Sequence, residues 1–321
     1  MKNLQKSMEN IIFFPENIDI SPFDCFVAAI GVFDGVHSGH REIIASARRR
    51  ANQTGAKVAA ISFSPHPRAL LCPDNPPDLL VSESGRVELL HQAGADICGF
   101  INFTHDAANL PPEEFLQQLK NNRLIQISGI CVGSKWRFGA GGKGNKDVLE
   151  KFCNKNNWSL DAVNELTYRK ETISSTAIRS AIAAGNLTDA AAMLGREVTL
   201  SGKVVHGYRI AGSKLNAPTA NLQPDSGLLP PDGVYSAAAI FDNISFPAVI
   251  NIGIAPTFGN NERRVEVHLI GFTGSLYDKE LTVVLHRFLR KEQTFPSPDE
   301  LKKQIVKDIE AVKKDNGLKN N

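Results

Sequence analysis

The stretch that most constrains this chain is a glycine-rich turn that contains two histidines and follows a short apolar run. It reads Ala29-Ile-Gly-Val-Phe-Asp-Gly-Val-His-Ser-Gly-His40, and the apolar run covers residues 26–30. The next residues, 41–50, have the apolar spacing of a helix. This order predicts a buried strand, a tight turn and a helix N-terminus, where backbone N–H groups and the helix dipole bind phosphate in α/β folds.

Six residues distinguish this turn from an ordinary strand-to-helix connection that carries two surface histidines. They are Gly31, Asp34, Gly35, His37, Gly39 and His40. The two histidines, three positions apart, add side-chain donors to the same place as the backbone donors. An ordinary connection would explain a glycine-rich turn alone, but the combination favours a phosphate site.

Length and composition limit the classes of protein to consider. A chain of 321 residues favours two domains, and 42% hydrophobic with 22% charged residues is ordinary for a globular protein. A net charge of +2 does not favour nucleic acid or membrane partners. We expect no membrane span and no signal peptide. The five cysteines are scattered without a C-x-x-C pair, which is typical of buried thiols in the cytoplasm.

The first half alternates predicted strands and helices. Strands are expected at 57–63, 96–101 and 126–132, with helices at 84–92 and 111–119. Near-continuous apolar strands that alternate with helices predict a doubly wound parallel sheet covered on both faces. Ligands of such sheets bind beyond the carboxyl ends of the strands. The histidine turn, an extended turn that displays His66 and Arg68, and the loop after Val132 all fall on that edge and can form one site.

Two later segments add candidate ligand groups. The loop Gly133–Asn145 holds five glycines, three cations and two aromatics, which suit either a mobile loop over phosphates and a ring or a plain surface loop. The segment 172–179 begins a helix, and its Ser174–Thr176 cluster suits N-capping. Arg179 follows within the first turns of that helix.

These segments resemble the nucleotidyltransferase half of the bacterial bifunctional riboflavin kinase/FAD synthetase family. The resemblance lies in residues 31–40, 63–68, 137–139 and 173–179. It implies that FMN attacks the α-phosphate of ATP to form FAD, with His37 and His40 holding the triphosphate and stabilising the α-phosphate. The residues implied in ATP binding are Gly31, Phe33, Asp34, Gly35, Gly39, Ser174, Ser175, Thr176 and Arg179, and those implied in FMN binding are His66, Arg68, Arg137 and Phe138.

Some positions depart from the usual pattern of this family. Lys135 and Trp136 replace an acid or Asn and a Phe, and Ala177 replaces an arginine that would reach phosphate. The loop also lacks the usual Arg near Gly142 and Asp near Asn145. Loss of one cationic partner costs on the order of 1.5–3 kcal/mol. We therefore expect an adenylyltransferase that is active but weakened.

The periodicity changes in the second half of the chain. The small-residue helical stretch 183–196 breaks at Gly185-Asn186, so we place the boundary there, with domains 1–187 and 188–321. Short strands follow at 198–206, 233–241, 246–252, 264–270 and 280–288, and 298–311 has helical spacing. This pattern predicts a small closed antiparallel β-barrel with a terminal helix.

Two motifs of this half carry candidate chemistry. In Lys214–Leu222, Pro218 begins a turn that presents Thr219 and Asn221 on one side, and their oxygens suit Mg²⁺. A plain turn would explain Pro-Thr alone. In 264–270, Glu266 shares a strand face opposite to the apolar residues, so it lies either in solvent or in a cavity inside the barrel, where it could act as a base.

This half resembles the flavokinase half of the same family. The matching motifs are Pro218-Thr-Ala-Asn221, Pro256-Thr-Phe-Gly259, Val265–Leu269 and Leu289–Phe295, with Asn216-Ala217 replacing the usual Gly-Phe. The resemblance implies transfer of the ATP γ-phosphate to riboflavin, with Glu266 as the general base and Mg²⁺ held by Thr219 and Asn221. The residues implied in ATP or flavin binding are Gly207, Gly212, Pro218, Thr219, Asn221, Arg290 and Phe295.

The sequence thus predicts a cytoplasmic bifunctional enzyme that makes FMN from riboflavin and then FAD. Its substrates and products are riboflavin, FMN, FAD and ATP. One alternative is an enzyme that keeps only the kinase. Another is a flavin- or nucleotide-binding protein without turnover, which the intact His37, His40 and Glu266 argue against. Homo-oligomerisation is left open.

Overall fold

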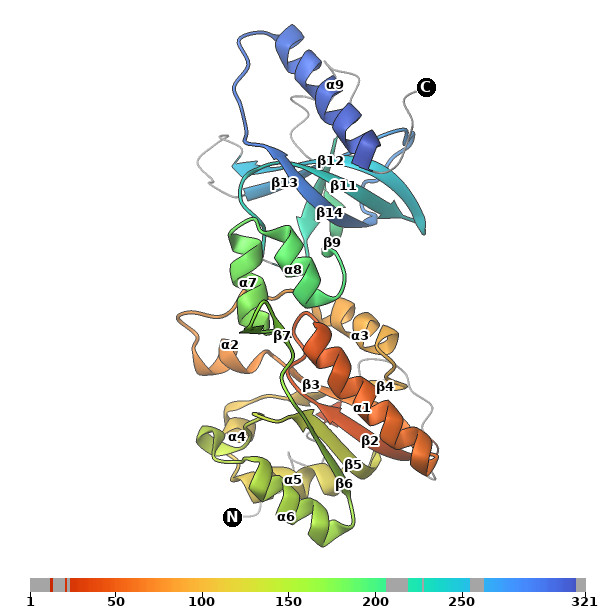
Figure 1. Cartoon of the computed structure of the whole chain (residues 1–321), viewed down its shortest axis with the longest axis vertical. Helices are drawn as coiled ribbons and strands as arrows, with labels where there is room; N and C mark the ends of the chain where they lie inside the picture. Colours follow the sequence, from red (N-terminus) through yellow and green to blue (C-terminus); the bar gives the residue numbers. More distant parts are fainter. Residues whose placement is uncertain are drawn as a thin grey trace. The chain divides into compact units, whose positions relative to one another are not determined.

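The computed structural model describes residues 12–13, 21, 24–205, 219–226, 228–254 and 263–315 (Figure 1). The chain forms two compact units, Met1–Pro77 with Ser82–Ser174, and Asp78–Val81 with Ser175–Asn321. Within the described ranges, none of the helices combines the length and the apolar character that crossing a bilayer requires.

The first unit is built on a six-stranded sheet of order β1-β4-β3-β2-β5-β6 (Figure 1). Its strands are β1 (Ile12–Phe13), β2 (Cys25–Ile30), β3 (Lys57–Ser64), β4 (Ile97–Asn102), β5 (Gln126–Gly133) and β6 (Ser159–Val163). Strands β2 to β6 are parallel, and β1 pairs antiparallel with β4. The predicted parallel sheet is confirmed.

Helices cover both faces of this sheet because its strands are apolar on both sides. The helical segments are α1 (Ser38–Thr54), α2 (Pro67–Leu71), α3 (Glu83–Gln92), α4 (His105–Ala108), α5 (Pro112–Lys120), η1 (Ala140–Gly142) and α6 (Lys146–Asn156). Along β2, Phe26, Ala28 and Ile30 join the core under α5 and α6. Val27 and Ala29 join the core under α1 and α3. The doubly wound architecture therefore follows from the alternation of side chains along each strand.

The strand order reverses beside β2. The chain steps from β2 to β3 and β4, and then returns past β2 to place β5 on its other side. Such a reversal opens a crevice at the carboxyl ends of the two central strands. The histidine turn follows β2 and the loop at residues 134–145 follows β5, so both lie at this crevice, as predicted.

The turn after β3 differs from its prediction. An extended turn was expected from the two prolines, but Pro67 begins the short helix α2, and the Ser64–Pro65 peptide bond is cis. Proline is favoured in the first turn of a helix because its missing N–H would have no partner there. His66 caps this helix, since its Nδ1 accepts a hydrogen bond from the Arg68 backbone N–H at 3.1 Å.

The second unit contains a closed barrel of order β10-β13-β12-β11-β14-β9. Its elements are the hairpin-joined β11 (Gly233–Phe241) and β12 (Ile244–Ile254), with β9 (Val198–Val205), β10 (Ala220–Pro224), β13 (Arg263–Leu269), β14 (Glu280–Arg290) and the final helix α9 (Pro298–Asp315). All neighbouring strands are antiparallel. The predicted barrel with a terminal helix is confirmed, with β10 as a strand that periodicity alone did not predict.

Two short strands and two helices complete the fold. The strands β7 (Thr167–Tyr168) and β8 (Glu171–Thr172) form a two-stranded sheet in the first unit. The helices α7 (Ser175–Ala183) and α8 (Leu187–Leu194) belong to the second unit, where α8 packs on β9 and β14. The first compact unit thus ends before residue 187, and the functional boundary predicted there stays a prediction.

The barrel separates an apolar interior from an outer face that α9 partly covers. Along β13, Val265 and Val267 are buried in the interior, whereas Glu266 and His268 lie on the outer face. Helix α9 packs over β11 and β12 (Figure 1), so β11 is buried on both faces from Gly233 to Ala239. Glu266 therefore lies neither in open solvent nor inside the barrel, because it faces a space beneath α9.

Candidate active sites

The histidine turn of the first unit has a strained backbone. Phe33 and Val36 have φ values of 53° and 39°, and Gly35 has φ 78°. A non-glycine residue in this region costs on the order of 1–3 kcal/mol, and such strain concentrates at functional sites. A hydrogen bond from the Gly31 N–H to the Ile61 carbonyl, at 3.1 Å, holds the start of the turn to β3.

Phe33 folds back under the turn because Gly31 has no side chain. A Cβ at residue 31 would lie 2.9 Å from Phe33 Cε1, closer than real contacts allow. The Phe33 ring is fully buried and meets the His40 ring edge-on, with 5.3 Å between centroids. Gly31 and Phe33, both predicted to bind ATP, thus support His40 from below.

The two histidines form a stacked pair at the start of α1. His37 caps the helix, and its Nδ1 accepts a hydrogen bond from the His40 backbone N–H at 3.3 Å. The two rings are parallel within 18°, with 3.6 Å between centroids. Because Nδ1 of His37 accepts, the neutral ring carries its proton on Nε2 and offers an N–H donor there. No acidic residue lies in the first turn of α1, so the helix dipole remains available to an anion.

His40 is neutral at physiological pH. Burial, followed by the charges of His37 and Arg86, lowers the pKa of His40 well below its ordinary value. Its Nδ1 is buried and makes no hydrogen bond to the described part of the chain. A neutral imidazole acts on phosphate as a hydrogen-bonding group, so the positive charge near the turn comes from elsewhere.

That charge is Arg86 of α3, which the sequence analysis did not single out. Arg86 is 3% exposed, and its Nη1 donates to the Val32 carbonyl at 3.0 Å and to Ser62 Oγ at 3.1 Å. Ser62 Oγ in turn donates to the Val32 carbonyl at 2.7 Å. Burial lowers the pKa of Arg86, and the nearby Asp34 opposes that shift. The signal available in the sequence was only an arginine at an apolar position of a helix.

The predicted FMN residues of the first unit differ in exposure. Arg137 and Arg68 are exposed, and His66 is half-buried as the cap of α2. Phe138 is 5% exposed and packs in the core, where its ring lies 4.7 Å from the Trp136 ring. Trp136 is thus the partly exposed aromatic of this loop.

Hydrogen bonds tie the loop after β5 to itself and to its neighbours. Phe138 and Gly144 form an isolated bridge, and the Ala140 N–H donates to the Leu110 carbonyl at 2.7 Å. Lys135, where the resemblance leads one to expect an acid or Asn, forms an ion pair with Glu165 at 2.5 Å. The positive charge of Lys135 is therefore partly compensated.

The predicted phosphate-binding cap lies where the chain passes from one unit to the other. Helix α7 begins at Ser175, so Ser174 precedes it as predicted, and Thr176 is exposed. Arg179 Nε donates to the Asp78 carbonyl at 2.7 Å. Ser175, Thr176 and Arg179 belong to the second unit and the histidine turn to the first, so the prediction that they share one site stays a prediction.

A cavity of about 310 Å³ lies on the outer face of the barrel in the second unit. Four of the predicted kinase residues line it: Thr219, Glu266, Arg290 and Phe295. Its further lining comes from β11 and β12 (Val234, Val249, Asn251), from His268, from the segment after β14 (Glu292, Gln293) and from α9 (Leu301, Ile305, Asp308). The cavity thus gathers residues that are distant in sequence.

Glu266 stands at the centre of a polar row across three strands. Its pairing partners are Asn221 on β10 and Asn251 on β12. Burial raises the pKa of Glu266, Arg264 lowers it, and the Glu292 carboxylate raises it further. A carboxylate with a raised pKa inside a cavity is suited to accept a proton from a bound hydroxyl.

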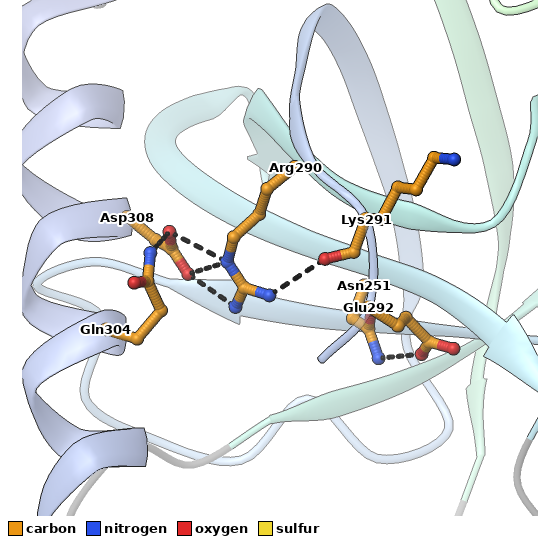
Figure 2. Close-up of polar contacts among 6 residues, drawn as sticks. All are labelled: Asn251, Arg290, Lys291, Glu292, Gln304 and Asp308. Carbon is orange, nitrogen blue, oxygen red and sulfur yellow. Dashed lines mark hydrogen bonds and ion pairs between the residues drawn. The ribbon is translucent and has the colours of Figure 1, made fainter. Parts of the chain in front are cut away.

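Hydrogen bonds link Asn251 to Glu292, and Arg290 to Asp308 (Figure 2). Asn251 Nδ2 donates to Glu292 Oε1 at 3.0 Å. Arg290 donates to both oxygens of Asp308, with a shortest distance of 2.8 Å. Asn251 and Asp308 lie in no recognisable motif, and Glu292 lies in the Leu289–Phe295 motif but was not predicted as a site residue.

A second, smaller cavity of about 130 Å³ lies beside the first. Inward-facing barrel residues line it, among them Val204 and Val267, together with Phe272 and Tyr277. Thr219 lines both cavities. Thr219 therefore lies where groups bound in the two cavities would meet.

Comparison with known proteins identifies both units. The family model for FAD synthetase matches residues 22–177, and the model for riboflavin kinase matches residues 194–315. The bifunctional riboflavin kinase/FMN adenylyltransferase of Pseudomonas fluorescens is 35% identical over 294 residues, which cover 89% of this chain and 92% of that protein. The chain belongs to the bifunctional riboflavin kinase/FMN adenylyltransferase family.

Other members of the riboflavin kinase/FMN adenylyltransferase family match over similar lengths. The Escherichia coli K12 protein is 33% identical, covering 91% of this chain and 93% of that protein. The Bacillus subtilis protein is 31% identical, covering 88% and 90%. A crystal structure named as a macrolide-efflux protein from Streptococcus pneumoniae is 28% identical with a TM-score of 0.82, covering 92% of this chain and 96% of that one. The efflux function in that name refers to the Streptococcus pneumoniae protein and is not attributed to this chain.

Family membership confirms the prediction of a riboflavin kinase and an FMN adenylyltransferase, which was drawn from the motifs. Several predicted residues of the kinase lie outside the described residues: Gly207, Gly212, Asn216, Pro218 and the segment 256–259. The individual roles of the described site residues stay predictions, and they enter the proposal below.

Proposed function

We propose that the second unit phosphorylates riboflavin to FMN and that the first unit then adenylylates FMN to FAD. The observation that carries the kinase half is the position of Thr219, which lines both the Glu266 cavity and the smaller cavity beside it. Riboflavin occupies the larger cavity, and the aromatic rings of Phe272 and Tyr277 suit the base of ATP in the smaller one. Thr219 then lies on the path of the γ-phosphate from ATP to riboflavin.

In the kinase step, Glu266 acts as the general base. Its carboxylate takes the proton of the ribityl 5′-hydroxyl as that oxygen bonds to the γ-phosphorus. The bond between the γ-phosphorus and the bridging oxygen breaks, ADP leaves, and Glu266 later releases the proton to water. The raised pKa of Glu266 supports this role, because a stronger base accepts the proton more readily.

The donor set near Glu266 fits Mg²⁺ that arrives with ATP. Thr219 and Asn221 supply a hydroxyl and an amide oxygen beside a carboxylate, and hard cations prefer oxygen ligands. The described part of the chain holds no cluster of three His, Cys, Asp or Glu side chains suited to a resident metal. Thr219 and Asn221 would hold an ion that arrives with the phosphates of ATP. When bound, Mg²⁺ neutralises phosphate charge.

In the adenylyl step, the protein positions two phosphates and stabilises charge. The FMN phosphate oxygen bonds to the α-phosphorus of ATP while the bond to pyrophosphate breaks, so no covalent enzyme intermediate is needed. His37 and His40 donate N–H groups to the α-phosphate at the start of α1. Arg86 supplies the fixed positive charge beneath the turn. The resemblance implies that Arg179 and the Ser174–Thr176 cap bind the outgoing phosphates.

The proposal is tested by incubating the protein with riboflavin, ATP and Mg²⁺ and separating the flavins by chromatography. FAD supports the complete proposal, and FMN alone means that the adenylyltransferase is inactive. If riboflavin remains unchanged, the chain binds flavin or nucleotide without turnover. We further place the enzyme in the cytoplasm, in agreement with its five free cysteines.

Replacing Glu292 by Gln tests the electrostatics of the kinase site. The Glu292 carboxylate raises the pKa of Glu266, so its removal lowers that pKa. The base is then ionised at lower pH, and the acid limb of the kcat–pH profile moves to lower pH. Stopped assays of FMN formation between pH 5 and 8 (roughly the range where such limbs appear) measure the shift. An acid limb that stays in place would contradict the coupling between the two carboxylates.

Replacing Arg86 by Lys tests the support of the histidine turn. Lysine keeps the charge but cannot bond Val32 and Ser62 with the geometry of a guanidinium. We expect adenylylation of supplied FMN to fall about tenfold, with riboflavin phosphorylation unchanged because the kinase site lies in the other unit. Separate assays of the two reactions check this. Equal loss of both activities would indicate general unfolding instead.

A further inference from the structure

The cavity of the kinase site contains a buried ion pair that the proposed chemistry does not use. Arg290 ends β14, and Asp308 lies on α9, facing it. Their side chains are 17% and 7% exposed. Arg290 Nε lies 3.1 and 3.2 Å from the two Asp308 oxygens, and Nη2 donates to Oδ2 at 2.8 Å. Figure 2 shows this fork between the strand and the helix.

A second layer of contacts holds the pair in one geometry. Gln304, one turn earlier on α9, donates from Nε2 to Asp308 Oδ1 at 2.9 Å. Arg290 Nη1 donates to the Lys291 carbonyl at 3.1 Å. The guanidinium is thus fixed from both sides, which is the arrangement expected where an arginine must present donors in a set direction.

Stability alone does not account for such a pair. Two charges lose hydration free energy when they are removed from water, and their mutual attraction barely compensates for this loss. Apolar residues of similar size often stabilise a fold as well or better. Here the pair lines the same cavity as Glu266, beside apolar Leu301 and Ile305 of α9. Positions 301, 305 and 308 share one face of the helix, so the charge interrupts an otherwise apolar stripe.

The hydrogen bonds of Arg290 leave part of its donor set available. A guanidinium has five N–H donors. The bonds above use one each on Nε, Nη1 and Nη2, so within the described part of the chain one N–H on each terminal nitrogen has no acceptor. The Phe295 ring lies 5.8 Å from the guanidinium carbon. Two donors beside an aromatic ring suit a flat, conjugated ring that carries carbonyl oxygens.

We infer that Asp308 is a positioning residue of the kinase site, which holds Arg290 so that its two remaining N–H groups meet the carbonyl edge of the flavin ring. This inference rests on the proposed function, because it takes riboflavin as the occupant of the cavity. Glu266 meets the ribityl hydroxyl, and Arg290 holds the ring of the same molecule. Asp308 acts through Arg290, which it holds in place.

The test replaces Asp308 by Asn, which keeps the shape but loses the charge and one acceptor oxygen. We expect the riboflavin KM, and the riboflavin Kd from quenching of flavin fluorescence, to rise about tenfold. The ATP KM and the adenylylation of supplied FMN stay unchanged. Asp308→Glu, which restores the carboxylate, should recover part of the affinity.

The matched control is Asp315→Asn. Asp315 also joins α9 to β14, through an ion pair with Arg287 at 2.9 Å, but it does not line the cavity. If the ion pairs only fasten the helix, both variants alter the kinetics alike, and the inference is overturned. A second test measures Asp308→Asn in an Arg290→Met background. If Asp308 acts through Arg290, it has no further effect there; additive effects overturn the inference.

Thio-substituted substrates test the carbonyl contact. Riboflavin with sulfur at C2 or C4 has a weaker acceptor there, so wild type should bind at least one analogue less well than riboflavin. Asp308→Asn should lose that discrimination, and a variant that keeps it in full overturns the inference. Failure of the proposed function is distinguishable, because wild type would then form no FMN from riboflavin at all.

Discussion

Glu266→Gln should lower the rate of FMN formation by about 10²- to 10⁴-fold, the usual contribution of a general base. The amide has nearly the shape of the carboxylate but cannot accept the proton of the ribityl hydroxyl. Riboflavin should still bind, since the apolar walls of the cavity and Arg290 remain. Single-turnover assays with labelled ATP measure the residual rate. Conversion of supplied FMN to FAD should remain close to that of wild type.

The control for this variant is Glu280→Gln, which makes the same change at an exposed position of the same barrel. It should leave both activities unaltered. A Glu266→Gln enzyme that keeps its kinase rate would remove Glu266 from the mechanism, and loss of both activities would point to unfolding. Thermal unfolding of all three proteins separates these cases.

His40→Ala should have the reverse pattern, with adenylylation lowered about 10²- to 10³-fold and kinase activity retained. This is the usual cost of removing one preorganised donor from a site of developing charge. His40 is neutral, so the loss reflects a missing hydrogen bond and not a missing cation. Because the pKa of His40 is already well below its ordinary value, titration of His40 should contribute no limb near pH 6.5 to the wild-type adenylylation rate.

The control is His105→Ala, at an exposed histidine of the same unit. It should adenylylate FMN as wild type does. Retention of adenylylation in His40→Ala would contradict the role of the histidine turn. Because the rings of His37 and His40 stack, the variant also removes the support of His37, so His37→Ala combined with His40→Ala should be less than additive.

Much of the fold followed from local patterns. Strands such as β2 are apolar at every position and buried on both faces, so their alternation with helices predicted the parallel sheet. A helix start was readable too, as α7 begins within the Ser174–Thr176 cluster. The turn after β3 was not, because Pro67 fits both an extended turn and the first turn of a helix. β10 was missed because five residues that end in proline show little periodicity.

The candidate site residues likewise divide into those that lie in short sequence motifs and those that only the tertiary structure reveals. The histidine turn, Thr219 and Glu266 lie in short motifs, so the sequence sufficed to propose them as site residues. Arg86, Asn251 and Asp308 lie in no motif, and each becomes a site residue only through a partner distant along the chain. Strand register and helix packing set these partners, and periodicity does not encode either.

The sequence by itself determined the family and the two activities, and it located the turn predicted to bind phosphate, because all three depend on contiguous residues. Only the tertiary structure decided where Glu266 lies. It lies on the outer face of the barrel, and the cavity there exists because α9 folds over β11 and β12. The structure also showed that the charge beneath the neutral His40 is a buried arginine from α3. Both features depend on side chains that are distant in sequence. Burial of apolar surface throughout the unit brings these side chains together.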